Sequence, residues 1–275
     1  MWLPIPRYRD TGFPSVVRNM KAGKVEKYIN EKIESDGGIL SIIIDPVDYS
    51  SPKNAIETGI KAEKAGADII AIGGSIGAQG ELLDTVTKGI KEKVKTPVVL
   101  FPGNIATISK YADAIYFMTL LNSRNPYYIS QAQTLAAPLL KNLKIEALPI
   151  GYIVVEPGGT VGWVGDANLV PRNKPKIAAS IAMAGQMAGK RIIFTDAGSA
   201  ADQPIPVDMV KEVSKNIDVP YLVAGGIRTP QQAYDIIKAG ADWIQIGTAV
   251  ENVSNVEKKV EDLVKSIKKA GNKKK

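Results

Sequence analysis

The sequence predicts a single α/β domain, a (β/α)₈ or TIM barrel, on three observations. The chain has 275 residues, and barrels of about 250 residues form one domain. Short apolar runs alternate with helical patterns from residue 39 onward, which is typical of parallel βα units. A nine-residue segment also recurs, as AGADIIAIG at 65–73 and AGADWIQIG at 239–247. Each copy is typical of a helix end, a glycine turn and a buried strand.

The apolar runs predict eight strands, and amphipathic spacing predicts helices outside them. The strands are expected at 39–45, 68–73, 97–101, 113–118, 147–155, 191–196, 220–224 and 242–247. The helices are expected at 52–65, 81–93, 175–187, 206–215 and 229–238, several with proline in the first turn. An open, doubly wound sheet alternates in the same way, but eight strands without a GxGxxG opening favour the closed barrel.

The two ends of the chain are predicted to lie outside the barrel, which is expected to span residues 24–267. Residues 1–23 form an N-terminal extension in this prediction, either a strap across the N-terminal face or partly disordered. Residues 268–275 are predicted to be a disordered basic tail. Much of the net charge of +7 lies near this end. A solvated lysine tail is favoured over a nucleic-acid site, and the functional alternative is peripheral contact with an anionic membrane surface.

The composition excludes several classes of chemistry. The chain has no cysteine and no histidine, so disulfides, thiolate catalysis, imidazole bases and histidine-ligated zinc are excluded. Any metal must be held by oxygen. The apolar runs are shorter than the roughly 20 residues that cross a membrane, and the first ten residues do not resemble a secretory signal. A cytoplasmic location is expected.

Glycines and hydroxyl side chains follow the last three predicted strands. Backbone N–H groups can approach an anion closely at glycine, and a following helix favours negative charge. The carboxyl ends of the final strands are also where barrel enzymes bind phosphate. The alternative is that these glycines only make tight turns, but their pairing favours a phosphate site. The residues concerned are Gly198, Ser199, Gly225, Gly226, Gly247 and Thr248.

A carboxylate ends the first predicted strand. Asp45 follows the apolar run III at 42–44 and precedes Pro46. Mg²⁺ takes one or two carboxylates and completes its shell with water and phosphate oxygens, so Asp45 is a candidate magnesium ligand. The alternative is that Asp45 caps the following turn, where Asp-Pro is common. Ser75 ends the next strand and is the candidate second oxygen.

Seven short motifs lie between about residue 24 and residue 267. They are IDP at 44–46, IGGS at 72–75, LFPG at 100–103, LLNSRNP at 120–126, GYIVVEPG at 151–158, TVGWVGDA at 160–167 and GGIR at 225–228. Together they resemble the archaeal geranylgeranylglyceryl phosphate synthases of group II, which are related to bacterial heptaprenylglyceryl phosphate synthases.

This resemblance implies a Mg²⁺-dependent transfer of a geranylgeranyl or similar group from its diphosphate to the 3-hydroxyl of sn-glycerol 1-phosphate, in ether-lipid synthesis. Asp45 and Ser75 would then hold Mg²⁺ against the diphosphate, and Asp196 would be the catalytic residue that orients or deprotonates the attacking glycerol hydroxyl. The residues implied in glycerol phosphate binding are Phe194, Thr195, Ala197, Gly198, Ser199, Ala200, Gly225, Gly226, Gly247 and Thr248. The resemblance also implies a homo-oligomer, a dimer or a hexamer.

The departures from the family pattern gather in the acceptor half of the site. The family motif YLEAGSG reads FTDAGSA at 194–200, so a tyrosine is lost and a glutamate is shortened to Asp196. Ser41 replaces the usual histidine, and Thr248 the usual asparagine.

Two hypotheses therefore remain: an active prenyltransferase with an altered acceptor site, and a catalytically weakened homologue retained for phosphate-ligand binding or assembly. The intact Asp45, Ser75 and glycines favour the enzyme. An unrelated sugar-phosphate barrel would not explain the match at 122–126. The prenyl chain length is not determined by these motifs; the aromatic residues expected near the prenyl groove are Tyr116, Phe117, Tyr127, Tyr128 and Trp163.

Overall fold

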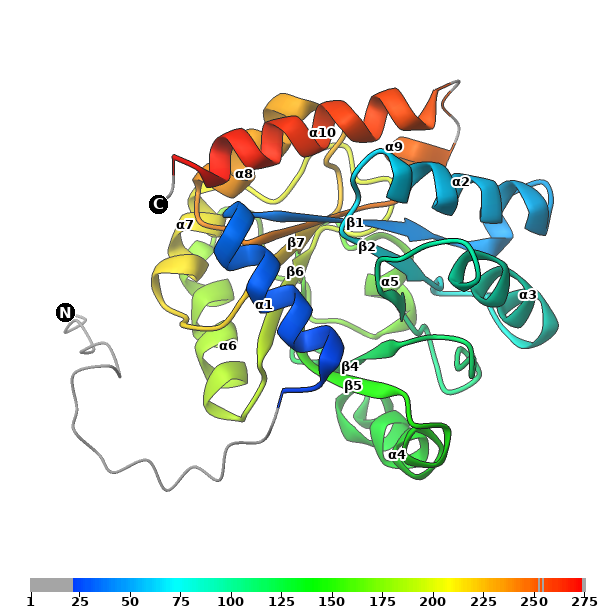
Figure 1. Ribbon diagram of the computed structural model, residues 1–275. Helices are drawn as coiled ribbons and strands as arrows, with labels where there is room; N and C mark the ends of the chain where they lie inside the picture. Colours follow the sequence, from blue (N-terminus) through cyan, green and yellow to red (C-terminus); the bar gives the residue numbers. More distant parts are fainter. Residues whose placement is uncertain (1–21, 252, 254, 274–275) are drawn as a thin grey trace.

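The computed structural model describes residues 22–251, 253 and 255–273 (Figure 1). The prediction for residues 1–21 lies outside these described residues. Eight parallel strands close into a barrel in chain order, with β1 paired to both β2 and β8. The strands are β1 (Ile39–Ile44), β2 (Ile69–Ile72), β3 (Val98–Leu100), β4 (Ala114–Leu120), β5 (Glu146–Val154), β6 (Ile192–Asp196), β7 (Tyr221–Ala224) and β8 (Trp243–Ile246). All eight predicted strands and the predicted TIM barrel are confirmed.

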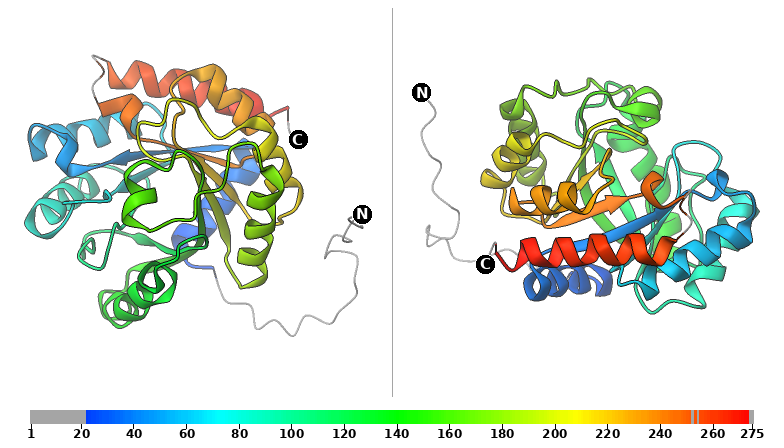
Figure 2. Two further views of the ribbon diagram at one scale, coloured as in Figure 1. Left: turned by 180° about the vertical axis from the view of Figure 1, so that it is seen from behind. Right: turned by 90° about the horizontal axis from the view of Figure 1, so that it is seen from above.

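Helices surround the barrel (Figures 1 and 2). The five predicted helices are α2 (Pro52–Lys64), α3 (Gly80–Lys91), α6 (Pro175–Met187), α7 (Val207–Lys215) and α8 (Pro230–Lys238), and they are confirmed. The structure adds α1 (Lys24–Asp36), η2 (Pro46–Asp48), η3 (Tyr127–Gln131), α4 (Ala132–Leu143), α5 (Gly159–Val164), α9 (Thr248–Glu251) and α10 (Val256–Gly271). Residues 101–113, between β3 and β4, contain no helix. The connection between β3 and β4 is therefore a loop.

Three aspartates fasten the N-terminal ends of the strands. Asp68, Asp113 and Asp242 each stand just before a strand and accept the backbone N–H of a residue at or beside the start of the preceding strand, at 2.9 to 3.0 Å. Two of them occupy the same place in the recurring AGAD segment, which explains why that segment repeats. A carboxylate that accepts a backbone N–H closes a hydrogen bond that the strand ladder leaves open.

Helix α1 closes the N-terminal end of the barrel. Val25 and Ile29 are buried in the same cluster as barrel-interior residues such as Trp243. The Glu146 carboxylate accepts the N–H groups of Val25 and Glu26, at 2.8 and 2.9 Å, so it satisfies donors that the first turn of the helix leaves free. The barrel interior is thereby sealed at this end, and access to it is from the carboxyl ends of the strands.

The prediction of a disordered tail from residue 268 is wrong for the residues that the structure describes. Helix α10 continues to Gly271, with Ile267 and Ala270 buried. The helical spacing of apolar residues persists through the lysine-rich segment, and the lysines occupy the other face. Lys268 also pairs with Asp36 of α1 at 3.1 Å. In the described parts of the chain, no helix is long and apolar enough to cross a membrane.

Candidate active site

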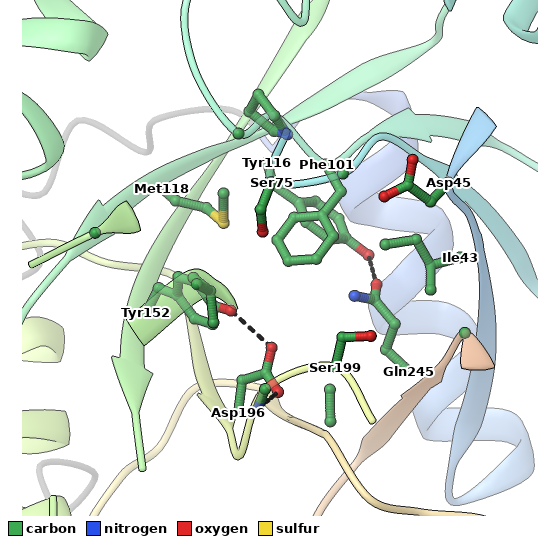
Figure 3. A pocket seen from close by; sticks show the side chains of 18 of the residues that line it. Ile43, Asp45, Ser75, Phe101, Tyr116, Met118, Tyr152, Asp196, Ser199 and Gln245 are labelled. Atoms are coloured by element: carbon green, nitrogen blue, oxygen red, sulfur yellow. Dashed lines mark hydrogen bonds between the residues drawn. The ribbon is translucent and has the colours of Figure 1, made fainter. Parts of the chain in front are cut away.

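A cavity opens at the carboxyl ends of the strands, and residues from all eight strands or the loops after them line it. Its two halves differ in chemistry. Carboxylates, hydroxyl groups and glycines from the ends of β1, β2 and β6 to β8 line one half. Phe101, Ile105, Ile108, Met118 and Val161 are among the apolar residues of the other half. Figure 3 shows Asp45 and Ser75 on one side of this space and Asp196 and Ser199 on another. One cavity can therefore hold both a highly charged group and an apolar chain.

Glycines shape the corner formed by the ends of β7 and β8. Gly225 and Gly226 have φ values of 84° and 71°, which a side chain rarely adopts. A Cβ atom at Gly226 would also collide with the backbone of Gln203. The Ser199 and Thr248 hydroxyl oxygens lie 3.2 Å apart across the same corner. These backbone N–H and hydroxyl groups make a site suited to a phosphate group.

Two arginines hold the loop after β6 by its carbonyl groups. Arg172 donates to the carbonyls of Gln203 and Pro204, and Arg228 donates to those of Ala200 and Asp202. The two guanidinium groups come from the loops after β5 and β7, on either side of the loop that they hold. Their planar arrays of N–H donors fix several carbonyls at once, which keeps the loop that carries Ser199 in place.

Asp196 lies at the end of β6, only 7% exposed, at the wall of the cavity. Its Oδ1 accepts the Gly198 N–H at 2.7 Å, and its Oδ2 accepts the Tyr152 hydroxyl at 2.6 Å (Figure 3). Burial raises the pKa of Asp196 above its usual range, while these two hydrogen bonds lower it. The ring of Phe194 stacks on Tyr152 at a centroid distance of 4.5 Å. Asp196 is therefore a rigidly oriented carboxylate in a poorly hydrated site.

Asp45 both caps a turn and faces the cavity. Its Oδ1 accepts the Val47 N–H at 3.3 Å as the N-cap of η2, so the capping hypothesis is confirmed. A Cβ atom at Gly74 would collide with Oδ2, so the glycine leaves room for this oxygen. Burial raises the pKa of Asp45 to about 6, with a further contribution from Asp48. The cap does not exclude metal binding, because the second oxygen is directed elsewhere.

Glu251 adds a third carboxylate to this side of the cavity. Burial, followed by the charges of Asp48 and Asp45, raises its pKa to about 7. Glu251, Asp45 and Asp48 all line the cavity. Within the described residues, however, no three acidic side chains converge closely enough to hold an ion alone. This side of the cavity is thus suited to a cation whose remaining ligands are water or oxygens of a bound substrate.

The structure separates the predicted site residues into two groups. Those that line the cavity are Asp45, Ser75, Asp196, Gly198, Ser199, Ala200, Gly225, Gly226, Gly247 and Thr248. Phe194, Thr195 and Ala197 are fully buried and are absent from its wall. Successive residues of a strand point to opposite faces, which explains part of this division. Thr195, for example, hydrogen-bonds to the Tyr221 hydroxyl at 2.8 Å, between the barrel and its helices.

The aromatic residues expected near a prenyl groove divide in a similar way. Tyr116, Phe117, Tyr127 and Tyr128 line the cavity. Trp163 of α5 does not, and it is 83% exposed. Several other cavity-lining side chains were not predicted from the sequence, among them Tyr152, Gln245 and Glu251. For Gln245 a signal was available, because it replaces Ala71 of the first copy of the recurring segment.

Comparisons with known proteins agree with this site. The model of the PcrB family matches residues 41–270. The geranylgeranylglyceryl phosphate synthases of Thermococcus kodakarensis and Pyrococcus furiosus are each 52% identical to the chain, over 252 and 251 residues. Each alignment covers 90% of this chain and 99% of the relative. The chain belongs to the PcrB family.

A solved geranylgeranylglyceryl phosphate synthase has the same architecture. The (S)-3-O-geranylgeranylglyceryl phosphate synthase of Thermoplasma acidophilum, in complex with its substrate sn-glycerol-1-phosphate, superimposes with a TM-score of 0.85 at 38% identity. The superposition covers 90% of this chain and 100% of that one. The predicted resemblance to these synthases, the barrel and the prenyltransferase class are confirmed.

Proposed function

We propose that this protein transfers a geranylgeranyl group from its diphosphate to the 3-hydroxyl of sn-glycerol 1-phosphate, in the synthesis of ether lipids. The observation that carries this proposal is that one cavity combines a glycine-rich anion corner, the carboxylates of Asp45 and Asp196 on opposite sides, and an apolar half. The anion corner at Gly225, Gly226 and Thr248 suits the phosphate of the acceptor. The apolar half suits a polyprenyl chain.

The residues around Asp45 fit a magnesium ion. Asp45 offers one carboxylate oxygen, Ser75 a hydroxyl, and the nearby Asp48 and Glu251 add negative charge. In the part of the chain that the structure describes, no lysine or arginine forms an ion pair with Asp45, so its charge is left for a cation. A bound Mg²⁺ would neutralise charge on the diphosphate leaving group. We therefore propose Asp45 and Ser75 as its protein ligands.

Asp196 is proposed to receive the acceptor proton. As the C1–O bond to the diphosphate breaks, a lone pair of the glycerol C3 oxygen forms the new C1–O bond, and pyrophosphate leaves. The proton of that hydroxyl passes to the Asp196 carboxylate. Burial raises the pKa of Asp196, which makes the carboxylate a better proton acceptor near neutral pH. Tyr152 and the Gly198 N–H hold its orientation.

Turnover tests the proposal directly. The purified protein, incubated with Mg²⁺, radiolabelled geranylgeranyl diphosphate and sn-glycerol 1-phosphate, should release pyrophosphate and form a labelled prenyl ether. Product formation should require all three. If no ether forms while both substrates still bind, the shortened acid and the lost tyrosine have weakened catalysis, and the weakened-homologue hypothesis holds instead. The 52% identical relatives, named as synthases, favour the active enzyme.

Binding of a simple anion tests the phosphate corner separately. A crystal grown at high phosphate concentration should show phosphate against the N–H groups near Gly226 and Thr248. An empty corner in such a crystal would contradict the assignment.

A cytoplasmic location, a dimer or hexamer and a peripheral membrane contact stay predictions. Fractionation of cells, light scattering and vesicle sedimentation would test them in turn.

A further inference from the structure

Gln245 lies within β8 with its amide in the wall of the cavity, although it is only 3% exposed. Its Oε1 accepts the Tyr116 hydroxyl at 2.9 Å and the Ser41 hydroxyl at 3.3 Å. Ser41 in turn accepts the Trp243 indole N–H at 2.8 Å. An indole N–H can only donate, so this chain of bonds starts at Trp243 and ends at the amide oxygen.

This network orients the amide. Two hydroxyl groups converge on Oε1, so the NH₂ group is directed away from them and toward the cavity, as Figure 3 shows. Among the described residues, no acceptor is hydrogen-bonded to Nε2. A primary amide has two donors, and a donor that a bound molecule covers without accepting its hydrogen bond is destabilising. The NH₂ group is therefore set to donate to a molecule in the cavity.

Strand register places this donor opposite Asp196. Asp196 pairs with Ala224 across β6 and β7, and Ala224 pairs with Gln245 across β7 and β8. The three residues thus stand in one row. Neighbouring strands are about 4.8 Å apart, so roughly 10 Å separates the two outer backbones. The methyl group of Ala224 leaves a slot between the carboxylate and the amide, directly below the Gly225–Gly226 corner.

The slot matches a three-carbon polyol phosphate. With the phosphate in the glycine corner, the two hydroxyl groups of the glycerol reach into the slot, where a carboxylate stands on one side and an amide donor on the other. The attacking hydroxyl needs a proton acceptor, which Asp196 provides. A donor to that same oxygen would withdraw the lone pair that it needs for attack. The amide donor is therefore better matched to the hydroxyl that does not react.

We infer that Gln245 is a specificity residue whose NH₂ group donates a hydrogen bond to the C2 hydroxyl of the acceptor. The inference rests on the proposed function for the identity of the acceptor. Tyr116 and Ser41 act through Gln245 as positioning residues. The expected consequence is discrimination against acceptors that lack the C2 hydroxyl, because such a molecule would cover the amide donor without giving it a partner.

Two acceptors and two variants test this inference. The acceptors are sn-glycerol 1-phosphate and 3-hydroxypropyl phosphate, which lacks only the C2 hydroxyl. For the wild type, affinity measured by calorimetry and kcat/KM should favour glycerol phosphate by roughly 10- to 100-fold. Gln245→Met should lower both quantities for glycerol phosphate by a similar factor and leave the deoxy acceptor within about threefold, so that the preference disappears.

Gln133→Met is the matched control. Gln133 also lines the cavity, but its Nε2 donates to the carbonyls of Met118 and Tyr128 in the apolar half. This variant should affect both acceptors equally and retain the preference. Equal losses for both acceptors in Gln245→Met would overturn the inference, because general damage to the fold has that effect. If the wild type binds with the expected preference but forms no product, the proposed reaction fails and the role of Gln245 stands. If neither acceptor binds to the wild type, both fail.

Discussion

Among the residues that the structure describes, buried carboxylates have basic partners at the N-terminal end of the barrel and none at the carboxyl end. At the N-terminal end, Arg191 donates to both oxygens of Glu26, at 2.6 and 2.8 Å, and Lys32 lies 3.2 Å from Asp68. At the carboxyl end, Asp45 and Asp196 form no ion pair with any residue of the described ranges. Burial raises the pKa of both, as it also does for Asp68, so the two ends differ in whether a basic partner is present.

This difference separates stability from function in one domain. A paired carboxylate holds α1 against the barrel, and removing one partner leaves the other charge buried and unpaired. An unpaired carboxylate contributes little to stability, but it remains available to a cation or to a substrate proton. Changes at the N-terminal end should therefore reduce stability, and changes at the carboxyl end should reduce turnover.

The largest expected effect is the loss of turnover on removing Asp45. Asp45→Ala should lower Mg²⁺-dependent kcat by ~10³-fold or more, because the proposed metal ligand is lost and charge on the leaving group is no longer neutralised. The fold should stay intact, since the removed carboxylate is desolvated and has no basic partner. Activity assays measure the loss of turnover, and the thermal unfolding midpoint shows whether the fold is intact. Activity within threefold of the wild type would contradict the metal assignment.

Breaking the ion pair at the other end should produce the reverse pattern. Glu26→Gln leaves the Arg191 guanidinium without its carboxylate and should lower the free energy of unfolding by about 3 kcal/mol. The kcat/KM of the folded protein should not change. Glu31→Gln makes the same substitution at an exposed position of α1, and it should change stability by less than about 0.5 kcal/mol. Denaturant unfolding compares the two variants; equal stability would show that the pair contributes nothing.

At the carboxyl end, Asp196 and Tyr152 should affect turnover together. Asp196→Asn should lower kcat/KM for glycerol phosphate by ~10²-fold, as expected for the loss of a positioned proton acceptor. Tyr152→Phe removes a hydrogen bond that lowers the pKa of Asp196. The pKa should then rise, and the acid limb of the pH profile of kcat/KM should move to higher pH.

Tyr221→Phe is the control for Tyr152→Phe. It removes a phenol hydroxyl that is equally buried and hydrogen-bonded, to Thr195, but outside the cavity. It should reduce stability and leave the pH profile in place. An unmoved acid limb in Tyr152→Phe would mean that Tyr152 does not act on Asp196.

Most of the barrel could be predicted because its signals are local. Strand runs, proline-started helices and the recurring AGAD segment each reflect a single βα unit. Helix α4 was missed, and it contains Pro138, which ordinarily argues against a helix interior. Helix α10 was also missed, and its end was predicted to be disordered, because lysines on its exposed face hid the spacing of Ile267 and Ala270.

The candidate site was predictable where it follows the ends of strands. Asp45 and the glycines stand at the carboxyl ends, and closure of the barrel brings those ends together. Tyr152 and Gln245 lie within strands, where the sequence predicts barrel interior and gives no partner. Their roles depend on register across β5 to β8, which fixes neighbours far apart in the chain. Phe194, by contrast, was included only because it belongs to a continuous motif.

The smallest expected effect is a pH-dependent loss of stability at the N-terminal end. Burial would raise the pKa of Asp36, but hydrogen bonds from Lys32, Ser35 and Lys268 outweigh it and lower the pKa to about 2. A lowered pKa means that this contribution to stability is complete above pH ~4 and is lost as the pH falls toward 2. Asp36→Asn should therefore lower the free energy of unfolding by about 1 kcal/mol at pH 7, allowing for solvent screening, and by almost nothing at pH 2. Asp262→Asn, which breaks an exposed pair with Lys258 on α10, should have a smaller effect at pH 7. Unfolding curves of wild type and both variants between pH 2 and pH 7 test this prediction. If the difference in the free energy of unfolding between Asp36→Asn and wild type did not disappear at pH 2, the lost stability would come from packing and not from the carboxylate charge.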